Sequence, residues 1–413
     1  MTKLAIQGGP KAFPNGLGVK WPIFDQTEEK ALLKVLHSGS WWRGGDMQSQ
    51  AKSVCGEFER SFAQWQDAAF GLCVPNGTIA VELALRAAGV KAGDEVIVPS
   101  LSFVVSASAA LPLGAIPVFA DCDPKTYQSD PASIEAMISP RTKAIVIVHF
   151  GGYPADLDRI VKIAQKHKIP LIEDCAHAQG SQWRGKGLGS YGDFGTFSFQ
   201  QSKAFTSGEG GVVLCQTREN WGKLYRFHNL GRLEDSGFYD FHDVSSNYRL
   251  TDLQGALLLA QFNRYKKLIV KKDANQAYLS GLLRKIGGVE PLPDDPRITR
   301  RGHYYYVFKY DAAQFGGLHR EEFLKALQAE GVPAGHSYGR AIHKYPLFQN
   351  MKVPAKYKNS QYKKVCCPVA ENAFANELCV LGHTTLLADR AVLAKIAQTI
   401  VKVKENAAAL MAK

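Results

Sequence analysis

Alternation of strand-like and helix-like segments between residues 68 and 215 is the feature that most constrains the fold. Two segments, 77–89 and 154–168, carry apolar residues at helical spacing. Between and around them, six short apolar runs predict strands at 95–98, 116–120, 144–149, 171–174, 194–199 and 212–215. Because these runs are almost continuously apolar, helices are expected on both faces of a mainly parallel sheet. The fold class is therefore α/β.

The pattern changes after residue 250. Residues 251–285 predict one long helix that begins at Thr251 or Asp252, since both residue types are common helix caps. Residues 303–311 alternate like a strand, and residues 320–331 predict a helix that ends at Gly331. We therefore expect a large domain over residues 1–290 and a smaller C-terminal α+β domain over residues 291–413.

Composition excludes several classes of protein. The 413 residues suffice to bury a large core, and 46% apolar with 21% charged residues is ordinary for a globular chain. The net charge is +12, but the lysines form no compact stripe interleaved with aromatic residues, so no nucleic-acid partner is expected. The basic clusters fit solvated surfaces, and a phosphorylated small substrate would also fit the charge.

Cysteine spacing and hydropathy bear on the compartment. The eight cysteines show no C-x-x-C spacing, which favours reduced core residues of a cytoplasmic protein. The N-terminal residues contain no apolar segment of the kind that directs secretion. Residues 96–120 are uncharged, yet prolines and glycine interrupt them, so we expect strand, helix and strand rather than a membrane span.

Residues 74–85 (VPNGTIAVELAL) contain the first candidate binding element. A strand-like run meets Asn76, Gly77 and Thr78 and at once becomes helical. The start of a helix presents free N–H groups and a partial positive charge, and glycine lets an anion approach the backbone. The segment therefore predicts a phosphate site, although alone it also fits an ordinary Asn-Gly turn.

Two further segments carry reactive side chains. Glu173 and Asp174 end an apolar strand, where ligands bind in open α/β sheets, although a structural ion pair would also fit. Lys203 lies between two apolar strands and is expected to point into the interior. A desolvated lysine has a lowered pKa and can form a Schiff base with an aldehyde.

Together these elements are the parts that pyridoxal 5'-phosphate requires. The lysine would bind the aldehyde carbon, the carboxylate would keep the pyridine nitrogen protonated, and the helix start would hold the phosphate. An aromatic side chain is expected against the ring, and Phe103 follows the neighbouring strand. We expect no metal.

The chain resembles the DegT/StrS-type aminotransferases of fold type I, which act on keto-sugars and keto-cyclitols. The segments EDCAHA (173–178) and FQQSK (199–203) are also similar to those of scyllo-inosose aminotransferases and 3-amino-5-hydroxybenzoate synthases. The resemblance covers about residues 70 to 265 and extends into the flanks. The matching blocks include NGTIAVELAL (76–85), GDEVIVPSLSFVVSA (93–107), IEDCAHAQGSQW (172–183), FSFQQSKAFTSGEGG (197–211) and NYRLTDLQGALLLAQ (247–261).

The resemblance implies a role for each matching residue. Lys203 would form the Schiff base, and Asp174 would pair with the pyridine nitrogen. His177 would lie near the phenolic oxygen of the cofactor. The remaining cofactor contacts would be Gly77, Thr78, Ser198 and Phe103, with Asn247 reaching the phosphate of the neighbouring subunit's cofactor in a homodimer with shared sites.

Substrate contacts are less well marked. A double tryptophan and the arginine after it stand in SGSWWRGGD (38–46), and other polar residues occupy loop positions. Packing or surface roles would fit each of them as well. The candidates are Trp41, Trp42, Arg43, His228, Arg232, Arg249, Tyr338, Arg340 and His343.

The predicted function is amino transfer from glutamate or glutamine to a keto-sugar or keto-cyclitol. One alternative is a dehydratase like 3-amino-5-hydroxybenzoate synthase, which would use the same cofactor and lysine. The other is a pyridoxal-phosphate-binding regulatory protein without turnover. The presence of both Lys203 and Asp174 favours an enzyme.

Overall fold

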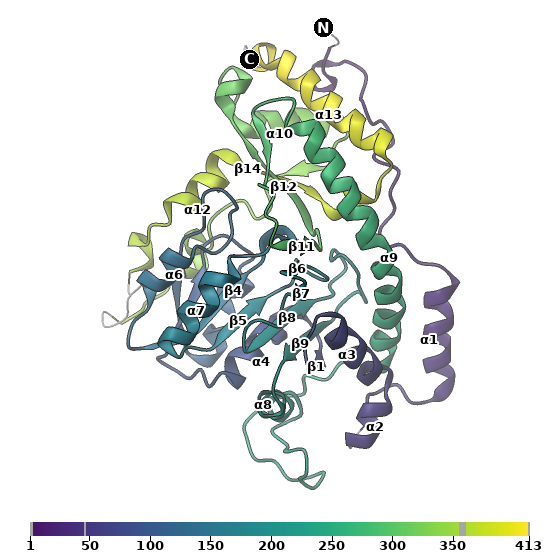
Figure 1. Cartoon of the computed structure of the whole chain (residues 1–413), viewed down its shortest axis with the longest axis vertical. Helices are drawn as coiled ribbons and strands as arrows, with labels where there is room; N and C mark the ends of the chain where they lie inside the picture. The colour runs from purple at the N-terminus through teal and green to yellow at the C-terminus, as the bar shows by residue number, and fades with distance from the viewer. Residues whose placement is uncertain (1–2, 45–46, 355–360, 412–413) are drawn as a thin grey trace.

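The computed structural model describes residues 3–44, 47–354 and 361–411. A seven-stranded sheet forms its centre, in the order β1-β9-β8-β5-β4-β2-β3 (Figure 1). The strands are β1 (Phe70–Val74), β2 (Glu95–Pro99), β3 (Ile116–Ala120), β4 (Thr142–Val148), β5 (Leu171–Asp174), β8 (Phe194–Ser198) and β9 (Gly211–Cys215). All six predicted strands are confirmed to within two residues at each end.

Strand direction follows the prediction with one exception. Strands β3, β2, β4, β5 and β8 pair in parallel, whereas β9 is antiparallel to both of its neighbours, β8 and β1. The sheet is therefore mainly parallel. The antiparallel β9 follows β8 through a short connection, and Lys203 lies in that connection.

Helices cover both faces of the sheet. Helices α4 (Gly77–Ala87) and α8 (Arg218–His228) pack on one face, and α3 (Val54–Trp65), α7 (Leu157–His167) and α9 (Asp252–Leu283) pack on the other. Alternate residues of β2 illustrate this, since Val96 and Val98 belong to the first core and Ile97 to the second. Burial on both faces explains why the strand runs are almost continuously apolar.

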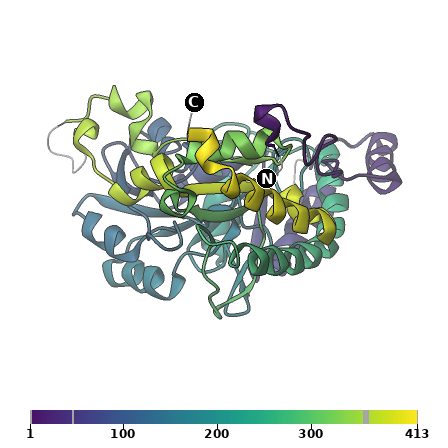
Figure 2. The same cartoon turned by 90° about the horizontal axis from the view of Figure 1, so that it is seen from above.

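Helix α9 connects the large sheet to a smaller one. The predicted start is confirmed, because the Thr251 side chain accepts a hydrogen bond from the Gln254 N–H, and the Gln254 side chain reaches back to residue 251. The first half of α9 packs against α1 (Gln26–Ser38) and α3. Leu279 and Leu283, near its end, belong to the core of the smaller sheet. Figure 2 shows α1, in purple, at one end of the molecule.

The smaller sheet is antiparallel, in the order β10-β12-β14-β13. Its strands are β10 (Val289–Pro291), β12 (Tyr305–Tyr310), β13 (Ala334–Gly335) and β14 (Leu378–Gly382), and helices α10 (Arg320–Ala329) and α13 (Arg390–Glu405) pack against it. The predicted strand and helix of this part are confirmed. The division at residue 290 stays a prediction, because Leu4 packs into this core while Ile342 and Phe348 return to the large one.

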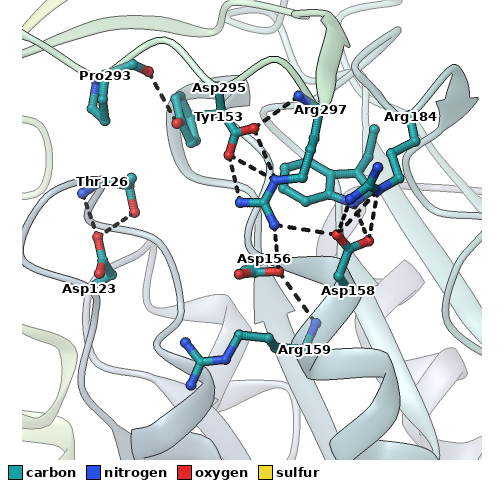
Figure 3. A network of polar contacts seen from close by, with 11 residues as sticks. Asp123, Thr126, Tyr153, Asp156, Asp158, Arg159, Arg184, Pro293, Asp295 and Arg297 are labelled. Carbon is teal, nitrogen blue, oxygen red and sulfur yellow. Dashed lines mark hydrogen bonds and ion pairs between the residues drawn. The ribbon is translucent and has the colours of Figure 1, made fainter.

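An ion-pair network fixes the segment between the two sheets (Figure 3). The Arg297 guanidinium lies 2.7 Å from the Asp295 carboxylate, and its other nitrogen lies 3.3–3.4 Å from the carboxylates of Asp158 and Asp156. Arg184 also pairs with Asp158 at 2.8 Å. Hydrogen bonds from Arg184, Trp183 and Arg297 hold the pKa of Asp158 well below its usual value. The network ties the start of α7 to the residues that precede β11 (Ile298–Arg300).

The uncharged stretch forms interior elements. Residues 96–120 contribute to β2, the short helix α5 (Val105–Ser108), a 3-10 turn and β3, as predicted. In the part of the chain that the structure describes, no helix is long and apolar enough to span a bilayer. All eight cysteines are free, and all but Cys366 are buried.

Candidate active site

A cavity of about 440 Å³ lies at the carboxyl ends of the parallel strands, where ligands bind in sheets of this kind. Eight of the residues predicted as cofactor or substrate contacts line it. These are Gly77, Thr78, Phe103, Asp174, His177, Ser198, Lys203 and Tyr338. Further lining residues, not predicted from the sequence, include Ser102, Gln200, Ser202, Glu209 and Tyr304. The structure thus brings the three separate sequence segments into one cavity.

The start of α4 forms one wall of the cavity. The Asn76 side chain caps the helix by accepting a hydrogen bond from the Ile79 N–H at 3.0 Å. The N–H groups of Gly77 and Thr78 belong to the first turn and have no partner within the helix. A Cβ atom added at Gly77 would lie 2.7 Å from the Ser198 Cβ, so only glycine permits this approach of α4 to β8. The result is a concave, positively polarised surface that fits a phosphate.

Substitution of Gly77 by alanine is expected to weaken binding of pyridoxal 5'-phosphate about tenfold. Relief of the short contact requires α4 to move away from β8, and overpacking of this kind costs about 1–3 kcal/mol. Equilibrium titration with the cofactor measures the effect. Gly281→Ala is the matched control, because nothing lies within 4 Å of a Cβ atom at that position. Equal cofactor affinities of the two variants would contradict the assignment of the phosphate site.

The two carboxylates at the end of β5 point in different directions. Glu173 accepts hydrogen bonds from the N–H groups of Gly189, Tyr191 and Gly192 and lies 3.1 Å from the His149 imidazole, so its oxygens are satisfied within the core. Asp174 instead lines the cavity. The sequence fits either a ligand contact or a structural ion pair at these two carboxylates. Glu173 makes structural contacts within the core and does not line the cavity.

Asp174 is a buried carboxylate whose desolvation cost is only partly offset by its neighbours. It accepts hydrogen bonds from the Ser106 hydroxyl at 2.8 Å and from the Ala176 N–H at 3.1 Å. Burial nevertheless raises the pKa of its carboxyl, because these bonds and the nearby Lys203 offset only part of the desolvation cost. A cationic group brought into the cavity beside Asp174 would supply the missing compensation. A protonated pyridine nitrogen is such a group.

Lys203 reaches the same cavity from the connection between β8 and β9. Burial lowers the pKa of its ammonium to about 8, while the Asp174 carboxylate acts in the opposite direction. Its Nζ lies 4.3 Å from the centre of the Tyr304 ring. A larger fraction of this amine is therefore neutral at physiological pH than of an ordinary lysine, as a nucleophile requires.

A second buried lysine does not line the cavity. Lys272, on α9, is only 1% exposed, and its Nζ donates to the Gly302 carbonyl at 3.3 Å. Burial lowers the pKa of its ammonium to about 7. A low lysine pKa alone therefore does not identify the reactive residue in this chain; the surrounding cavity does.

Aromatic rings form the wall opposite the phosphate site. The His177 imidazole stacks on Tyr304 with 4.1 Å between ring centres, and its Nε2 lies 2.8 Å from the Tyr338 hydroxyl. The His177 Nδ1 accepts from the Gly151 N–H, and burial holds the pKa of this imidazole well below its usual value. His177 is thus neutral and donates its Nε2–H to Tyr338. Phe103 is half exposed beside Tyr338, where it is free to stack on a ligand.

Several predicted substrate contacts lie elsewhere in the chain. Arg43 is 2% exposed and makes a two-bond ion pair with Glu59 at 2.6 and 3.0 Å. His228 is fully buried, and His343 is buried with its Nε2 3.0 Å from the Glu371 carboxylate. Within one chain, none of these three residues lines the cavity. The ion pair with Glu59 holds the Arg43 side chain in the core, away from the cavity.

The other candidates also lie outside the lining of the cavity. Trp41 and Trp42 are about half exposed, and the Arg249 guanidinium lies 5.9 Å from the Trp42 ring. Asn247 is exposed, and its side chain accepts a hydrogen bond from the Arg249 N–H. Arg232 packs its guanidinium over two exposed phenylalanines, and Arg340 is exposed. Their roles in binding stay predictions.

Sequence comparison agrees with this geometry. Residues 22–399 match the DegT/DnrJ/EryC1/StrS aminotransferase family. The chain belongs to this family. A Streptomyces kanamyceticus protein named as an L-glutamine:3-amino-2,3-dideoxy-scyllo-inosose aminotransferase is 39% identical, over 98% of this chain and 97% of that protein. The 3-amino-5-hydroxybenzoate synthase of Amycolatopsis mediterranei (strain S699) is 37% identical, over 92% and 95% respectively.

Solved structures of DegT/StrS-type enzymes share the fold. A crystal structure of 3-amino-5-hydroxybenzoic acid synthase superposes with a TM-score of 0.84 at 36% identity, covering 93% of this chain and 97% of the other. Three sequence predictions are therefore confirmed: the family, the α/β aminotransferase fold and the activity of an aminotransferase. The cofactor of this aminotransferase is pyridoxal 5'-phosphate, and the helix start, the buried carboxylate and the low-pKa lysine of the cavity fit it.

Proposed function

We propose that this aminotransferase moves the amino group of glutamine to a keto-cyclitol, with Lys203 and Asp174 as its catalytic residues. The observation that carries the proposal is the meeting of Lys203, Asp174 and the start of α4 in one cavity. The names of the related enzymes, which specify glutamine and inosose derivatives, support the donor and the acceptor. Glutamate as donor and a keto-sugar as acceptor are outcomes of the test.

The residues of the cavity suit proton transfer. When bound, pyridoxal 5'-phosphate supplies an electron sink that makes a proton of the attached amino donor acidic. With its pKa lowered to about 8, Lys203 Nζ takes that proton as a base and returns it as an acid. Asp174 holds positive charge at the ring nitrogen. His177 and Phe103 confine the ring, and Gly77, Thr78 and Ser198 hold the phosphate.

The lining of the cavity favours an uncharged polyol as acceptor. Among the described residues that line it, Lys203 is the one lysine or arginine. Beside the carboxylates of Asp174 and Glu209, the lining offers the hydroxyl and amide groups of Ser102, Gln200, Ser202, Tyr304 and Tyr338. A sugar attached to a nucleoside diphosphate calls for cations against its phosphates, whereas a cyclitol needs hydrogen-bonding partners for its hydroxyls.

The complete enzyme is proposed to be a cytoplasmic homodimer. The exposed Asn247 is assigned to the phosphate of the neighbouring subunit's cofactor, and Trp41, Trp42 and Arg249 lie close to it on the same surface. The free cysteines suit a reducing compartment. The site would then contain residues of two chains.

A half-reaction assay tests the proposed substrates. The purified protein is converted to its aminated form with ¹⁵N-glutamine (amino-labelled) or ¹⁵N-glutamate, freed of donor, and offered a panel of ketones. Label in the amine of a scyllo-inosose derivative, after glutamine, is the expected result. Label in a nucleotide-linked sugar would contradict the cyclitol assignment.

The same assay distinguishes the proposed amino transfer from a second candidate function. The Amycolatopsis mediterranei relative favours a 3-amino-5-hydroxybenzoate synthase-like dehydratase. Such an enzyme would convert an amino-cyclohexenone precursor to an aromatic product with loss of water and without an amino donor. Formation of that product by the donor-free protein, with no labelled amine from any ketone, would replace the proposal.

A further inference from the structure

Tyr304 is a cavity residue that neither the sequence motifs nor the assigned roles explain. It precedes β12, in the chain segment that leads into the small sheet, and is 8% exposed. One contact of its ring is the stacked His177, and its hydroxyl lies 3.0 Å from the Ser202 hydroxyl. The Ser202 hydroxyl in turn donates to the Gln200 side chain at 2.7 Å. The ring is therefore held on several sides beside the connection that carries Lys203.

The ring also contacts the reactive amine directly. Lys203 Nζ lies 4.3 Å from the Tyr304 ring centre, within the range of a cation–π interaction. Within the described parts of the chain, no carboxylate forms an ion pair with this ammonium, and Asp174 acts on it only at longer range. The aromatic face is thus a direct contact of the Lys203 ammonium.

We propose that Tyr304 is a positioning residue for Lys203: when the amine is protonated and not joined to the cofactor, the ring binds the ammonium and holds it at the cavity wall. The proposal rests on the assignment of Lys203 as the cofactor-bearing lysine. In amino transfer the lysine must leave the cofactor and still move a proton at it. A lysine has a long flexible stem, and a ring that attracts the protonated amine but not the neutral one restricts it in its acid form.

A graded series of rings at position 304 tests this contact. Tyr304→Phe and Phe analogues with increasing fluorination keep the ring in place and withdraw electron density from its face in steps. Each protein is loaded with pyridoxamine 5'-phosphate, which leaves Lys203 free. The pH dependence of trace acetylation at Lys203, measured by peptide mass spectrometry, gives the pKa of its amine.

The expected result is a stepwise fall of the Lys203 pKa along the fluorinated series, by about one unit in total, because each step weakens the attraction for the ammonium. Tyr304→Phe itself is expected to titrate like the unmodified protein, since it loses only the hydroxyl bond to Ser202. Lys272 is the internal control in every sample, and its pKa is expected to stay constant. A Lys203 pKa that is flat or rises along the series would overturn the proposal.

A second measurement separates this proposal from the assignment on which it rests. Borohydride reduction of the protein loaded with pyridoxal 5'-phosphate should leave the cofactor attached to the peptide that contains Lys203. Attachment to Lys272 would refute the assignment of the lysine, whatever the titration shows. Attachment to Lys203 together with an unresponsive pKa would refute the role of Tyr304 alone.

Discussion

Replacement of Lys203 by alanine is expected to lower turnover by at least about a thousandfold, because the variant loses both the covalent attachment of the cofactor and the group that moves the proton. Lys203→Arg is the matched control, since it keeps a cation at the position but cannot bind the aldehyde. Both variants are expected to retain the phosphate site and to bind pyridoxamine 5'-phosphate. Turnover within tenfold of the unmodified enzyme would exclude Lys203.

The same variant tests the shared site. In a mixed dimer of Lys203→Ala and Asn247→Ala chains, one site carries both changes and the other carries neither, provided that Asn247 serves the neighbouring cofactor. Co-refolding of equal amounts is then expected to give about a quarter of the unmodified specific activity, above each variant refolded alone, for random pairing. If Asn247 acted within its own chain, every mixed site would carry one change and no recovery would be seen.

The substitution Asp174→Asn is expected to leave cofactor binding nearly intact and to lower turnover about 10- to 100-fold. Asparagine keeps the shape and still accepts a hydrogen bond from Ser106, but it lacks the charge that stabilises a protonated pyridine. A hydrogen bond to a charged group contributes about 1.5–3 kcal/mol, and each 1.36 kcal/mol of barrier is a factor of ten in rate.

The variant Glu173→Gln is the control that separates a loss of fold stability from a loss of catalytic function. Glu173 is the neighbouring carboxylate and is bonded to core N–H groups instead of lining the cavity. The change at residue 173 is expected to lower the stability of the fold, measured by denaturant unfolding, more than turnover per folded site. The reverse pattern, with Asp174→Asn near normal in turnover, would exclude Asp174 from the role.

Much of the large sheet could be predicted because strands buried on both faces appear in the sequence as short, almost continuously apolar runs. Strand direction leaves no such trace, and so the antiparallel β9 could not be predicted from its apolar residues. The position of Lys203 could be predicted because two buried strands leave its connection little choice but the end of the sheet.

Residues whose position depends on distant partners could not be predicted. Alternation along β5 implies that Glu173 and Asp174 face opposite sides, but only the packed structure shows which side holds the cavity. Arg43 stands beside two exposed tryptophans, and nothing local indicates its pairing with Glu59. Tyr304 opens a run of three tyrosines, and periodicity alone does not distinguish a strand residue from one that contacts a ligand.

The pairing of β1 with β9 has a consequence for how the chain is made. Residues 70–74 leave the ribosome roughly 140 residues before their partners at 211–215, an interval of about 7 to 28 seconds at ordinary rates of synthesis. Throughout that time the strand has no neighbour to pair with, although β2, β3, β4, β5 and β8 are all synthesised before β9. Lys203 lies just before β9. During synthesis, the reactive lysine and the last strand of the large sheet are therefore added at nearly the same time.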